Sequence, residues 1–515
     1  MYVIKGKTSD WELVIGLETH IEVLSKSKLF SGASADYNPG VAPNVQVSMV
    51  DAAMPGMLPV LNRECVRQAI KMGFGLNADI SKKSKFARKQ YFYPDLPSGY
   101  QISQPAEEPP IVGRGFIEIV GEDSNPKKIL IQRAHLEQDA GKNKHDAHPS
   151  KSFVDLNRSG VALLEIVTFL DVGGKEKNSY IQSPVEAERY LREVRSIARA
   201  LGVSNANMEE GSMRADINIS VRPVGEKVFR TRTEVKNMVS FKFIKAAIEF
   251  ESRRQIEIYE SGGRVSQDTM RFNQNDGTTS VMRSKEDALD YRYFPDPDLL
   301  PLIITDEEIE SVRKTMPELP AARKKRYAAT GLSAPDADRI GEDKELYELF
   351  DAVVGVPVVD AAGADGVGTA VASAAVAASA VPPVRAKMAA NWILGDLSAN
   401  PEYRMSAANL AELIDMIMSN DISGKIAKDI FAKMVAGESG SPREIADKHG
   451  LKQTTDRGEI EDAVDKVIAE NVASVAEYKA GKVGLIGFFV GLVLKSTGGK
   501  ANPKIVNEIL LKKLG

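Results

Sequence analysis

Stretches of alternating apolar and polar residues dominate the chain up to about Pro301. They are separated by turn-rich segments such as 36–40 and 95–99 and by some helical stretches. Alternation with a period of two is typical of half-buried strands. Beyond Pro301 apolar residues recur at three- and four-residue spacing, for example over 342–353 and 406–419. The pattern therefore predicts an α+β region of short strands and helices followed by a helical region.

The same pattern predicts three domains, which agrees with a length of 515 residues. The expected divisions are an α+β domain of mostly antiparallel strands over 1–303, an all-α domain over 304–419 and a small helical tail over 420–515. The segment 355–383 is rich in Ala, Gly and Val. Its composition is low in complexity, so its structure stays open.

Three of the predicted strands, at 11–23, 129–139 and 213–222, place polar side chains on one face and mainly apolar ones on the other. A fourth alternating stretch, at 229–236, adds basic residues beside the acids. The polar positions are Glu18, His20 and Glu22 in the first strand, Arg133, His135, Glu137 and Asp139 in the second, Arg214, Asp216, Asn218 and Ser220 in the third, and Arg230, Arg232, Glu234 and Lys236 in the fourth.

Glu165 interrupts the otherwise apolar run 161–167. Burying an unpaired carboxylate costs several kcal/mol, so we expect a positive charge beside it. One interpretation is a buried ion pair with Arg158 or another arginine. The other is a divalent ion shared by several strands, with Glu18, His20, Glu137 and Glu165 as its candidate ligands.

Clustered carboxylates with one imidazole and no thiolate favour Mg²⁺ or Mn²⁺ over zinc. Mg²⁺ is usually held by one or two carboxylates together with substrate phosphates, so such a site implies a nucleotide such as ATP. The sequence has neither a P-loop nor a dinucleotide-binding glycine motif after a strand. The phosphates would therefore be bound by the ion and by basic side chains, with Arg158, Arg214, Lys236 and Arg292 as candidates. The alternative is a polar barrel interior without phosphoryl transfer.

Composition excludes several classes of protein. Apolar residues make up 43% and charged residues 27%, as in ordinary globular proteins, which argues against a disordered or fibrous chain. Cys65 is the only cysteine, so the chain alone cannot form a disulfide or a cysteine-ligated zinc site. The N-terminus lacks an apolar stretch typical of a signal sequence, and no segment is suited to span a membrane. We therefore expect a cytoplasmic protein.

Two further features are typical of nucleic-acid binding. The net charge is −4, yet the segment 471–515 carries seven lysines against two glutamates. A phosphate backbone would suit this local excess, although a solvated lysine-rich surface is an equal alternative. Aromatic residues also cluster beside basic ones at 89–95 and 290–295. These aromatic side chains could stack on an unpaired base, but packing is their more frequent use.

Longer motifs resemble the B subunits of bacterial glutamyl/aspartyl-tRNA amidotransferases, and they occur in the order found in that family. They are VIGLETH (14–20), YFYPD (91–95), GYQISQ (99–104), HLEQDAGK (135–142), DLNR (155–158), MEEGSMR (208–214), EVKN (234–237) and DYRYFPDPD (290–298). Near the end, GK (481–482), GFFVG (487–491) and ANP (501–503) resemble a YqeY-type tail.

The resemblance implies a cradle-shaped catalytic domain, then a helical domain and a tail that contact tRNA. It implies a heterotrimeric ligase in which an amidase subunit hydrolyses glutamine and a small C subunit completes the complex. Ammonia would pass through a channel, and the B subunit would use ATP to activate the misacylated carboxylate. By matching motifs, Mg²⁺ would be bound by Glu18, His20, Glu137 and Glu165, with Glu210 and Asp216 as weaker candidates. Within the basic segment described above, Lys482, Lys495 and Lys500 are the residues expected to contact tRNA.

The sequence departs from this family at one place. Many members have a four-cysteine zinc site near the first strand, but the matching positions are Ser31, Ala33, Ser48 and Asp51. We therefore expect no zinc, and a loop held by packing.

Two other functions remain open, a non-catalytic RNA-binding scaffold and an ATP-dependent carboxylate–amine ligase for a free small molecule. The sequence also does not distinguish Glu-tRNA(Gln) from Asp-tRNA(Asn), or identify the ammonia channel and the recognised tRNA features.

Overall fold

The computed structural model describes residues 2–37, 40–105, 108–144, 148–170, 179–283, 291–355, 382–451, 457–498 and 500–515. The chain divides into two compact units, of which the first comprises Met1–Pro320 and the second continues from Ala321. Most of the segment 355–383, whose structure the sequence left open, lies outside the described residues.

The described part of the first unit is built on a sheet of twelve strands. The main order is β14-β13-β12-β11-β2-β10-β7-β5-β4-β15, with β1 beside β2 and β6 beside β7. The strands are β1 (Ile4–Lys5), β2 (Asp10–Glu22), β4 (Ala87–Gln90), β5 (Tyr100–Ser103), β6 (Gly115–Val120), β7 (Pro126–Gln138), β10 (Ala162–Thr168), β11 (Met213–Pro223), β12 (Thr233–Met238), β13 (Thr269–Asn273), β14 (Thr278–Arg283) and β15 (Phe294–Pro295).

Neighbouring strands of this sheet are antiparallel except for the β12–β13 pair. Two small sheets accompany it, β3 (Lys83–Ser84) with β16 (Leu302–Ile303) and β8 (Lys142–Lys144) with β9 (Phe153–Asp155). The mixed, mostly antiparallel architecture confirms the predicted α+β class.

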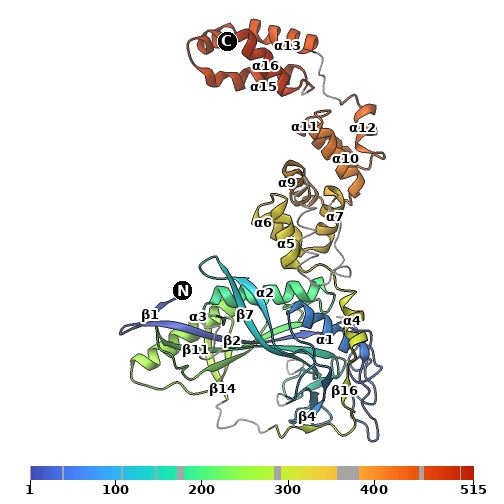
Figure 1. The fold of residues 1–515 in the computed structure, drawn as a ribbon, viewed down its shortest axis with the longest axis vertical. Coiled ribbons are helices and arrows are strands. Elements are labelled where there is room, and N and C mark those ends of the chain that lie inside the picture. The colour runs from blue at the N-terminus through green and yellow to red at the C-terminus, as the bar shows by residue number, and fades with distance from the viewer. Residues whose placement is uncertain are drawn as a thin grey trace. The chain divides into compact units, whose positions relative to one another are not determined.

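Three helices cover one face of the large sheet (Figure 1): α1 (Arg63–Gly75), α2 (Pro184–Ala200) and α3 (Phe241–Glu260). Helix α2 begins where the sequence favours it, because the Ser183 hydroxyl accepts a hydrogen bond from the Glu186 amide and Pro184 occupies the first turn. The apolar side chains of the strands pack with these helices in one hydrophobic core. The polar side chains that alternate with them must therefore project from the opposite face.

The second unit is helical throughout its described part. Its elements are α5 (Pro320–Ala329), which starts at the boundary, α6 (Ala334–Glu342), α7 (Lys344–Val354), α9 (Pro383–Trp392), the π-helix η3 (Ile393–Leu397), α10 (Ala407–Met418), α11 (Gly424–Val435), α12 (Pro442–Lys448), α13 (Arg457–Glu470), α14 (Val472–Lys479), the 3₁₀ helix η4 (Val483–Leu485), α15 (Ile486–Ser496) and α16 (Pro503–Leu514). None of the helices in the described ranges is long and apolar enough to cross a membrane.

The hydrophobic clusters group the chain differently from the predicted boundaries. Helix α4 (Asp306–Arg313) contributes Val312 to the core of the sheet, so this core continues beyond residue 303. A second cluster extends from Tyr327 to Ala446, and a third from Ile460 to Leu514. The helices at 424–448 therefore pack with the middle domain rather than with the tail. Helical periodicity alone could not show this, because it does not tell which helices share a core.

Candidate metal centre

Three neighbouring strands bring imidazole and carboxylate side chains together on the face of the sheet opposite α1, α2 and α3. Glu165 in β10 lies opposite His20 in β2 on one side and opposite His135 in β7 on the other. Directly opposed residues project to the same face of a sheet. The neighbours of Glu165 in the chain, Leu164 and Ile166, belong to the core on the other face. Strand pairing thus explains why a carboxylate is found within an apolar run.

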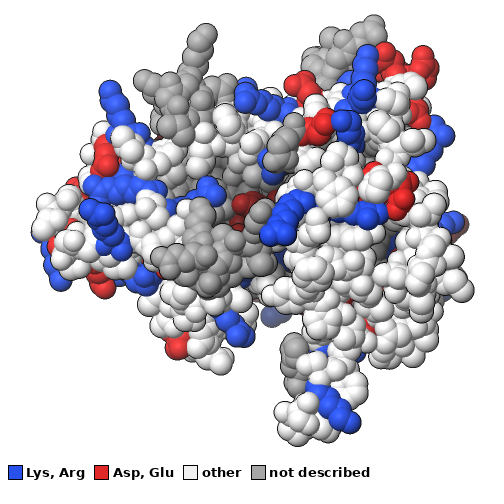
Figure 2. Space-filling model, turned by 90° about the horizontal axis from the view of Figure 1, so that it is seen from below, with Lys and Arg blue, Asp and Glu red and all other residues white. Residues whose placement is uncertain are grey.

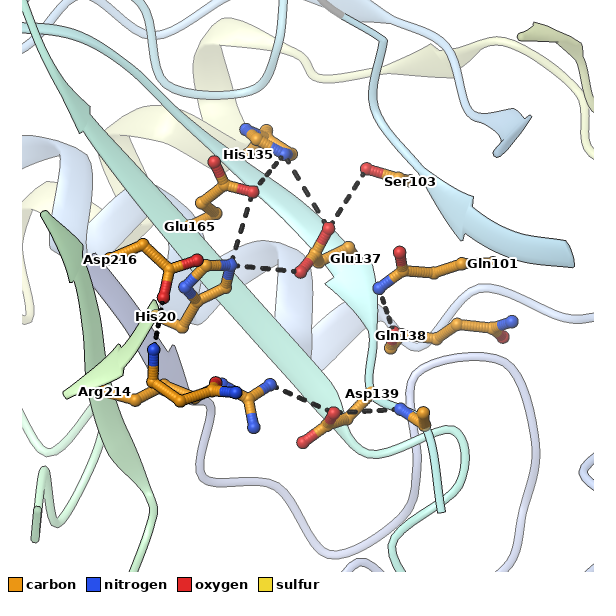
Figure 3. A network of polar contacts seen from close by, with 12 residues as sticks. His20, Gln101, Ser103, His135, Glu137, Gln138, Asp139, Glu165, Arg214 and Asp216 are labelled. Atoms are coloured by element: carbon orange, nitrogen blue, oxygen red, sulfur yellow. Dashed lines mark hydrogen bonds and ion pairs between the residues drawn. The ribbon is translucent and has the colours of Figure 1, made fainter. Parts of the chain in front are cut away.

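The first acidic cluster consists of His20, Glu137 and Glu165 (Figure 3). The Nε2 atom of His20 lies 3.4 Å from a carboxylate oxygen of Glu165 and 3.6 Å from one of Glu137. Candidate ligand atoms of the three residues all lie within 4.8 Å of one another. His135 adds a second imidazole, with Nε2 3.3 Å from Glu165. All four side chains are largely buried, so their charges are weakly screened by water.

The charges in this cluster depend strongly on one another. Burial lowers the pKa of His20, but Glu165 and Glu137 outweigh this effect and raise it to about 9. Burial raises the pKa of Glu165, whereas His135 and His20 bring it well below its ordinary value. The cluster therefore favours an ionised Glu165 beside a protonated His20, and a bound ion could take the place of that proton. Two carboxylates and an imidazole are ligands that a divalent ion such as Mg²⁺ or Mn²⁺ could use, so the residues present fit such an ion.

A second acidic cluster, formed by Glu18, Asp216 and Glu234, lies beside the first. Asp216 of β11 is opposite Glu18 of β2, and the Asn218 amide donates a 3.0 Å hydrogen bond to Glu18. Lys236 Nζ lies 3.1 Å from Glu234 and 3.4 Å from Asp216. Burial raises the pKa of Glu18, and the charges of Glu165, Glu234 and Asp216 raise it further. This cluster therefore already contains its own cation.

The predicted four-ligand set is thus divided between the two clusters. His20, Glu137 and Glu165 come together, but Glu18 lies with Asp216 and Glu234. The reason is the strand register: on the β10 side Glu18 is opposite the apolar Val167, whereas on the β11 side it is opposite Asp216. Of the two weaker candidates, Asp216 therefore belongs to the second cluster, and Glu210 is exposed in a turn outside both.

The basic candidates mostly have carboxylate partners already. Arg158 lies 3.4 Å from Asp139 and donates to the carbonyl groups of Ala140 and Gly141. Among the described residues the ion-pair partners of Glu165 are His20 and His135, so the interpretation that Glu165 pairs with Arg158 or another arginine is wrong. Arg214, opposite His20, lies 3.1 Å from Asp139. Lys236 belongs to the second cluster, while Arg292 is exposed. Burial raises the pKa of Asp139, but the two arginines bring it below its ordinary value.

Three residues of these clusters were not among the candidates from sequence. They are His135, Glu234 and Ser103, whose hydroxyl donates a 3.5 Å hydrogen bond to Glu137. The alternation placed His135 and Glu234 on polar faces, but not beside a particular partner. Strand pairing was the missing information, and a single sequence carries no direct signal for it.

The loop that departs from the resembling family is held by a buried ion pair. Lys28 Nζ lies 3.1 Å from Asp51, and the side chain of Lys28 has no exposed surface. The backbone amide of Ser48 donates a 2.8 Å hydrogen bond to the same carboxylate. Polar contacts thus contribute to a loop that was expected to depend on packing.

The remaining candidate features are an acidic hollow on the surface and the lysines of the tail. Acidic atoms lie in a hollow near the centre of the view in Figure 2, with lysines and arginines around it. In the second unit, Lys495 and Lys500 are exposed, and exposed Lys482 lies 3.1 Å from Glu477. The tail lysines are therefore accessible in the described structure.

Comparison with known proteins agrees with this arrangement. Residues 13–310 match the family described as the GatB/GatE catalytic domain, and residues 373–514 match the GatB domain. The B subunit of the aspartyl/glutamyl-tRNA(Asn/Gln) amidotransferase from Paramagnetospirillum magneticum is 49% identical, with 100% of this chain and 99% of the relative covered. The proteins of the same name from Acidiphilium cryptum and Allorhizobium ampelinum are each 50% identical, with 100% of this chain and 99% or 97% of the relative covered. The chain therefore belongs to the family of aspartyl/glutamyl-tRNA(Asn/Gln) amidotransferase B subunits.

Proposed function

We propose that this chain uses ATP to activate the side-chain carboxylate of misacylated Glu-tRNA(Gln), Asp-tRNA(Asn) or both for amidation. The products are Gln-tRNA(Gln) and Asn-tRNA(Asn). The convergence of His20, Glu137 and Glu165 on one face of the sheet is the observation that carries this proposal. The names of the relatives supply the reaction, and their designation as B subunits supports an assembly with other subunits. We expect these to be an amidase and a small C subunit.

The reaction needs activation because a free carboxylate is a poor acyl donor. Phosphoryl transfer from ATP converts it to an acyl phosphate, and ammonia from glutamine hydrolysis then displaces phosphate. When bound, Mg²⁺ supplies charge neutralisation and orientation for the phosphoryl group. Glu137 and Glu165 would hold the ion from neighbouring strands, and His20 would complete the set. Ser103 and His135 keep these carboxylates oriented through the contacts described above.

The remaining assignments belong to the same proposal. Arg214 and Arg158 lie next to the proposed reaction site, where both pair with Asp139. Lys236 holds Asp216 and Glu234 of the second cluster together, and Glu18 belongs to the same cluster. Arg292, which is exposed beside the edge strand β15, would bind the phosphates of ATP. We propose three domains, with the helices at 424–448 in the middle one, and a tail that binds the tRNA backbone through Lys482, Lys495 and Lys500. Cytoplasmic location fits a reaction on aminoacyl-tRNA.

The substitution Glu137→Gln tests this function in the assembled enzyme. It retains shape and hydrogen bonding but removes one ligand charge. We expect ATP-dependent amidation to fall by about 1000-fold or more, because the loss of ion-mediated charge stabilisation corresponds to several kcal/mol. Affinity for misacylated tRNA, measured by filter binding, should stay within about twofold. Undiminished amidation would contradict the assignment.

The same assay separates the two other functions. A non-catalytic scaffold predicts that amidation is insensitive to Glu137→Gln while tRNA binding persists. A ligase for free small molecules predicts that glutamate or aspartate replaces the charged tRNA as the acceptor. We expect amide formation only on the tRNA-linked amino acid.

A further inference from the structure

The two aromatic segments of the sequence form one group in the folded chain. Strands β4 and β15 pair antiparallel, and the Gln90 amide donates a 3.0 Å hydrogen bond to the Tyr291 carbonyl. The rings of Tyr91 and Tyr291 meet edge to face with centroids 6.1 Å apart. Tyr93 and Tyr293 extend this contact, each with one of these rings. We name Tyr91, Tyr93, Tyr291 and Tyr293 the tyrosine group.

Lys89 is positioned by the tyrosine group. Its Nζ atom lies 4.8 Å from the ring centroid of Tyr291 and 5.8 Å from that of Tyr91. A cation close to aromatic rings is attracted by their negative faces. Within the described ranges, no carboxylate lies at ion-pairing distance from this ammonium group. Lys89 therefore has a defined position but no direct anionic partner there.

The strand register directs Lys89 toward the first acidic cluster. Lys89 in β4 is opposite Gln101 in β5, and two residues further along β5, Ser103 is opposite Glu137 in β7. Lys89, Gln101, Ser103 and Glu137 consequently project from the same face of the sheet. Strands β4 and β7 are separated by two inter-strand spacings, about 10 Å, and Lys89 is displaced from the level of Glu137 by two residues, about 7 Å along the strands, so the Cα atoms of Lys89 and Glu137 lie about 12 Å apart. A lysine side chain and a bound phosphate chain can together bridge such a distance.

Electrostatics agree with this placement. Burial lowers the pKa of Lys89, but nearby groups, with Glu137 the largest contributor and Glu165 also acting, raise it above its ordinary value. Lys89 is thus a stable cation in the field of the cluster. Arg158, Arg214 and Lys236 differ from it because each is within 4 Å of a carboxylate.

We propose that Lys89 binds the phosphate chain of the nucleoside triphosphate used at the His20–Glu137–Glu165 cluster. This inference rests on the proposed function and adds a phosphate-binding residue to it. An ammonium group offers three donors and a compact charge to phosphate oxygens. The rings of Tyr91 and Tyr291 hold the ammonium group without neutralising it, so its charge stays available for the ligand.

The test compares Lys89→Met with the wild type in the assembled enzyme, using equilibrium binding of ATP and of adenosine. The variant keeps most of the side-chain length but loses the charge. We expect ATP to bind about 10- to 100-fold more weakly, because hydrogen bonds to charged groups are lost. Adenosine, which has no phosphate, should bind as before, and Lys89→Arg should retain most of the ATP affinity.

Lys128→Met is the matched control, because Lys128 also lies over an aromatic ring, 4.4 Å from the centroid of Phe116, on the same sheet. It should leave ATP affinity unchanged. If Lys89→Met does not fold, as judged by thermal melting, Lys89→Gln repeats the test with another neutral side chain.

Unchanged ATP affinity in the folded neutral variants would overturn the inference. If Mn²⁺ also bound more tightly to these variants, Lys89 would serve only to balance the negative charge of the cluster. A different result would contradict the proposed function itself: the wild-type complex would release no phosphate from ATP in the presence of misacylated tRNA.

Discussion

The two acidic clusters share one sheet face and one strand, yet they differ in what balances their carboxylates. In the first, the imidazoles of His20 and His135 lie beside Glu137 and Glu165, and a bound ion can take the place of the proton that an imidazole carries. In the second, the ammonium group of Lys236 lies within 3.4 Å of Asp216 and Glu234. Lysine cannot be a metal ligand while it is protonated. The difference teaches that grouped carboxylates alone do not define a metal site. The neighbouring side chains determine whether the carboxylates are available to bind an ion.

The largest expected difference is in the rate of amidation between the variants Glu165→Gln and Glu234→Gln. Glu165→Gln removes the carboxylate charge that faces both imidazoles and would bind the ion. We therefore expect about a 1000-fold loss of amidation, equivalent to several kcal/mol. Glu234→Gln removes one of two acidic partners of a partly exposed lysine, so we expect a loss below about tenfold. Initial rates at saturating ATP measure both, and equal losses would remove the distinction.

A substitution of His135 tests whether the first cluster depends on a residue outside the ligand set. His135→Leu removes the contact with Glu165, and we expect Mn²⁺ affinity to fall about 10- to 100-fold. His135→Gln offers an amide donor in place of the ring nitrogen and should restore part of the affinity. Electron paramagnetic resonance of Mn²⁺ reports binding without turnover. Equal affinities in both variants and the wild type would exclude this orienting role.

These residues also show how far the sequence was informative. The alternation of β2, β7 and β11 predicted which side chains leave the core, and Glu165 indicated a place where strong compensation was needed. Most of the α+β architecture followed from the same periodicity. The division of Glu18 from Glu165, and the approach of His135, depend on pairing between distant strands. Local patterns contain no register, so the exact membership of each cluster could not be predicted.

A smaller effect, on Mn²⁺ binding, is expected when the ammonium group of Lys236 is removed from the second cluster. Lys236→Met leaves Glu18, Asp216 and Glu234 without their ammonium partner. We expect this cluster to gain a weak Mn²⁺ site, while the affinity of the first stays within about twofold. Calorimetric titration should therefore show one additional low-affinity event. An unchanged titration would indicate that Lys236 does not prevent ion binding.

The smallest effect is expected from the tail, which should influence neither cluster. Removing Lys495 and Lys500 together should weaken tRNA binding several-fold and reduce its salt dependence by about one unit of logarithmic slope for each phosphate that is no longer neutralised. At saturating tRNA, the ratio of activities between Glu165→Gln and Glu234→Gln should stay the same. Lys466→Ala is a control because Lys466 is exposed on α13, outside the predicted tRNA-binding residues. An unaltered tRNA affinity would remove the tail from the binding surface.

The most direct test is a Mn²⁺ titration of the wild-type assembled enzyme and its Glu137→Gln and Glu234→Gln forms, with ATP present. We expect one tight site in the wild type, its loss in Glu137→Gln and its retention in Glu234→Gln. Retention of the tight site in Glu137→Gln, with loss in Glu234→Gln, would place the ion in the other cluster and contradict the account.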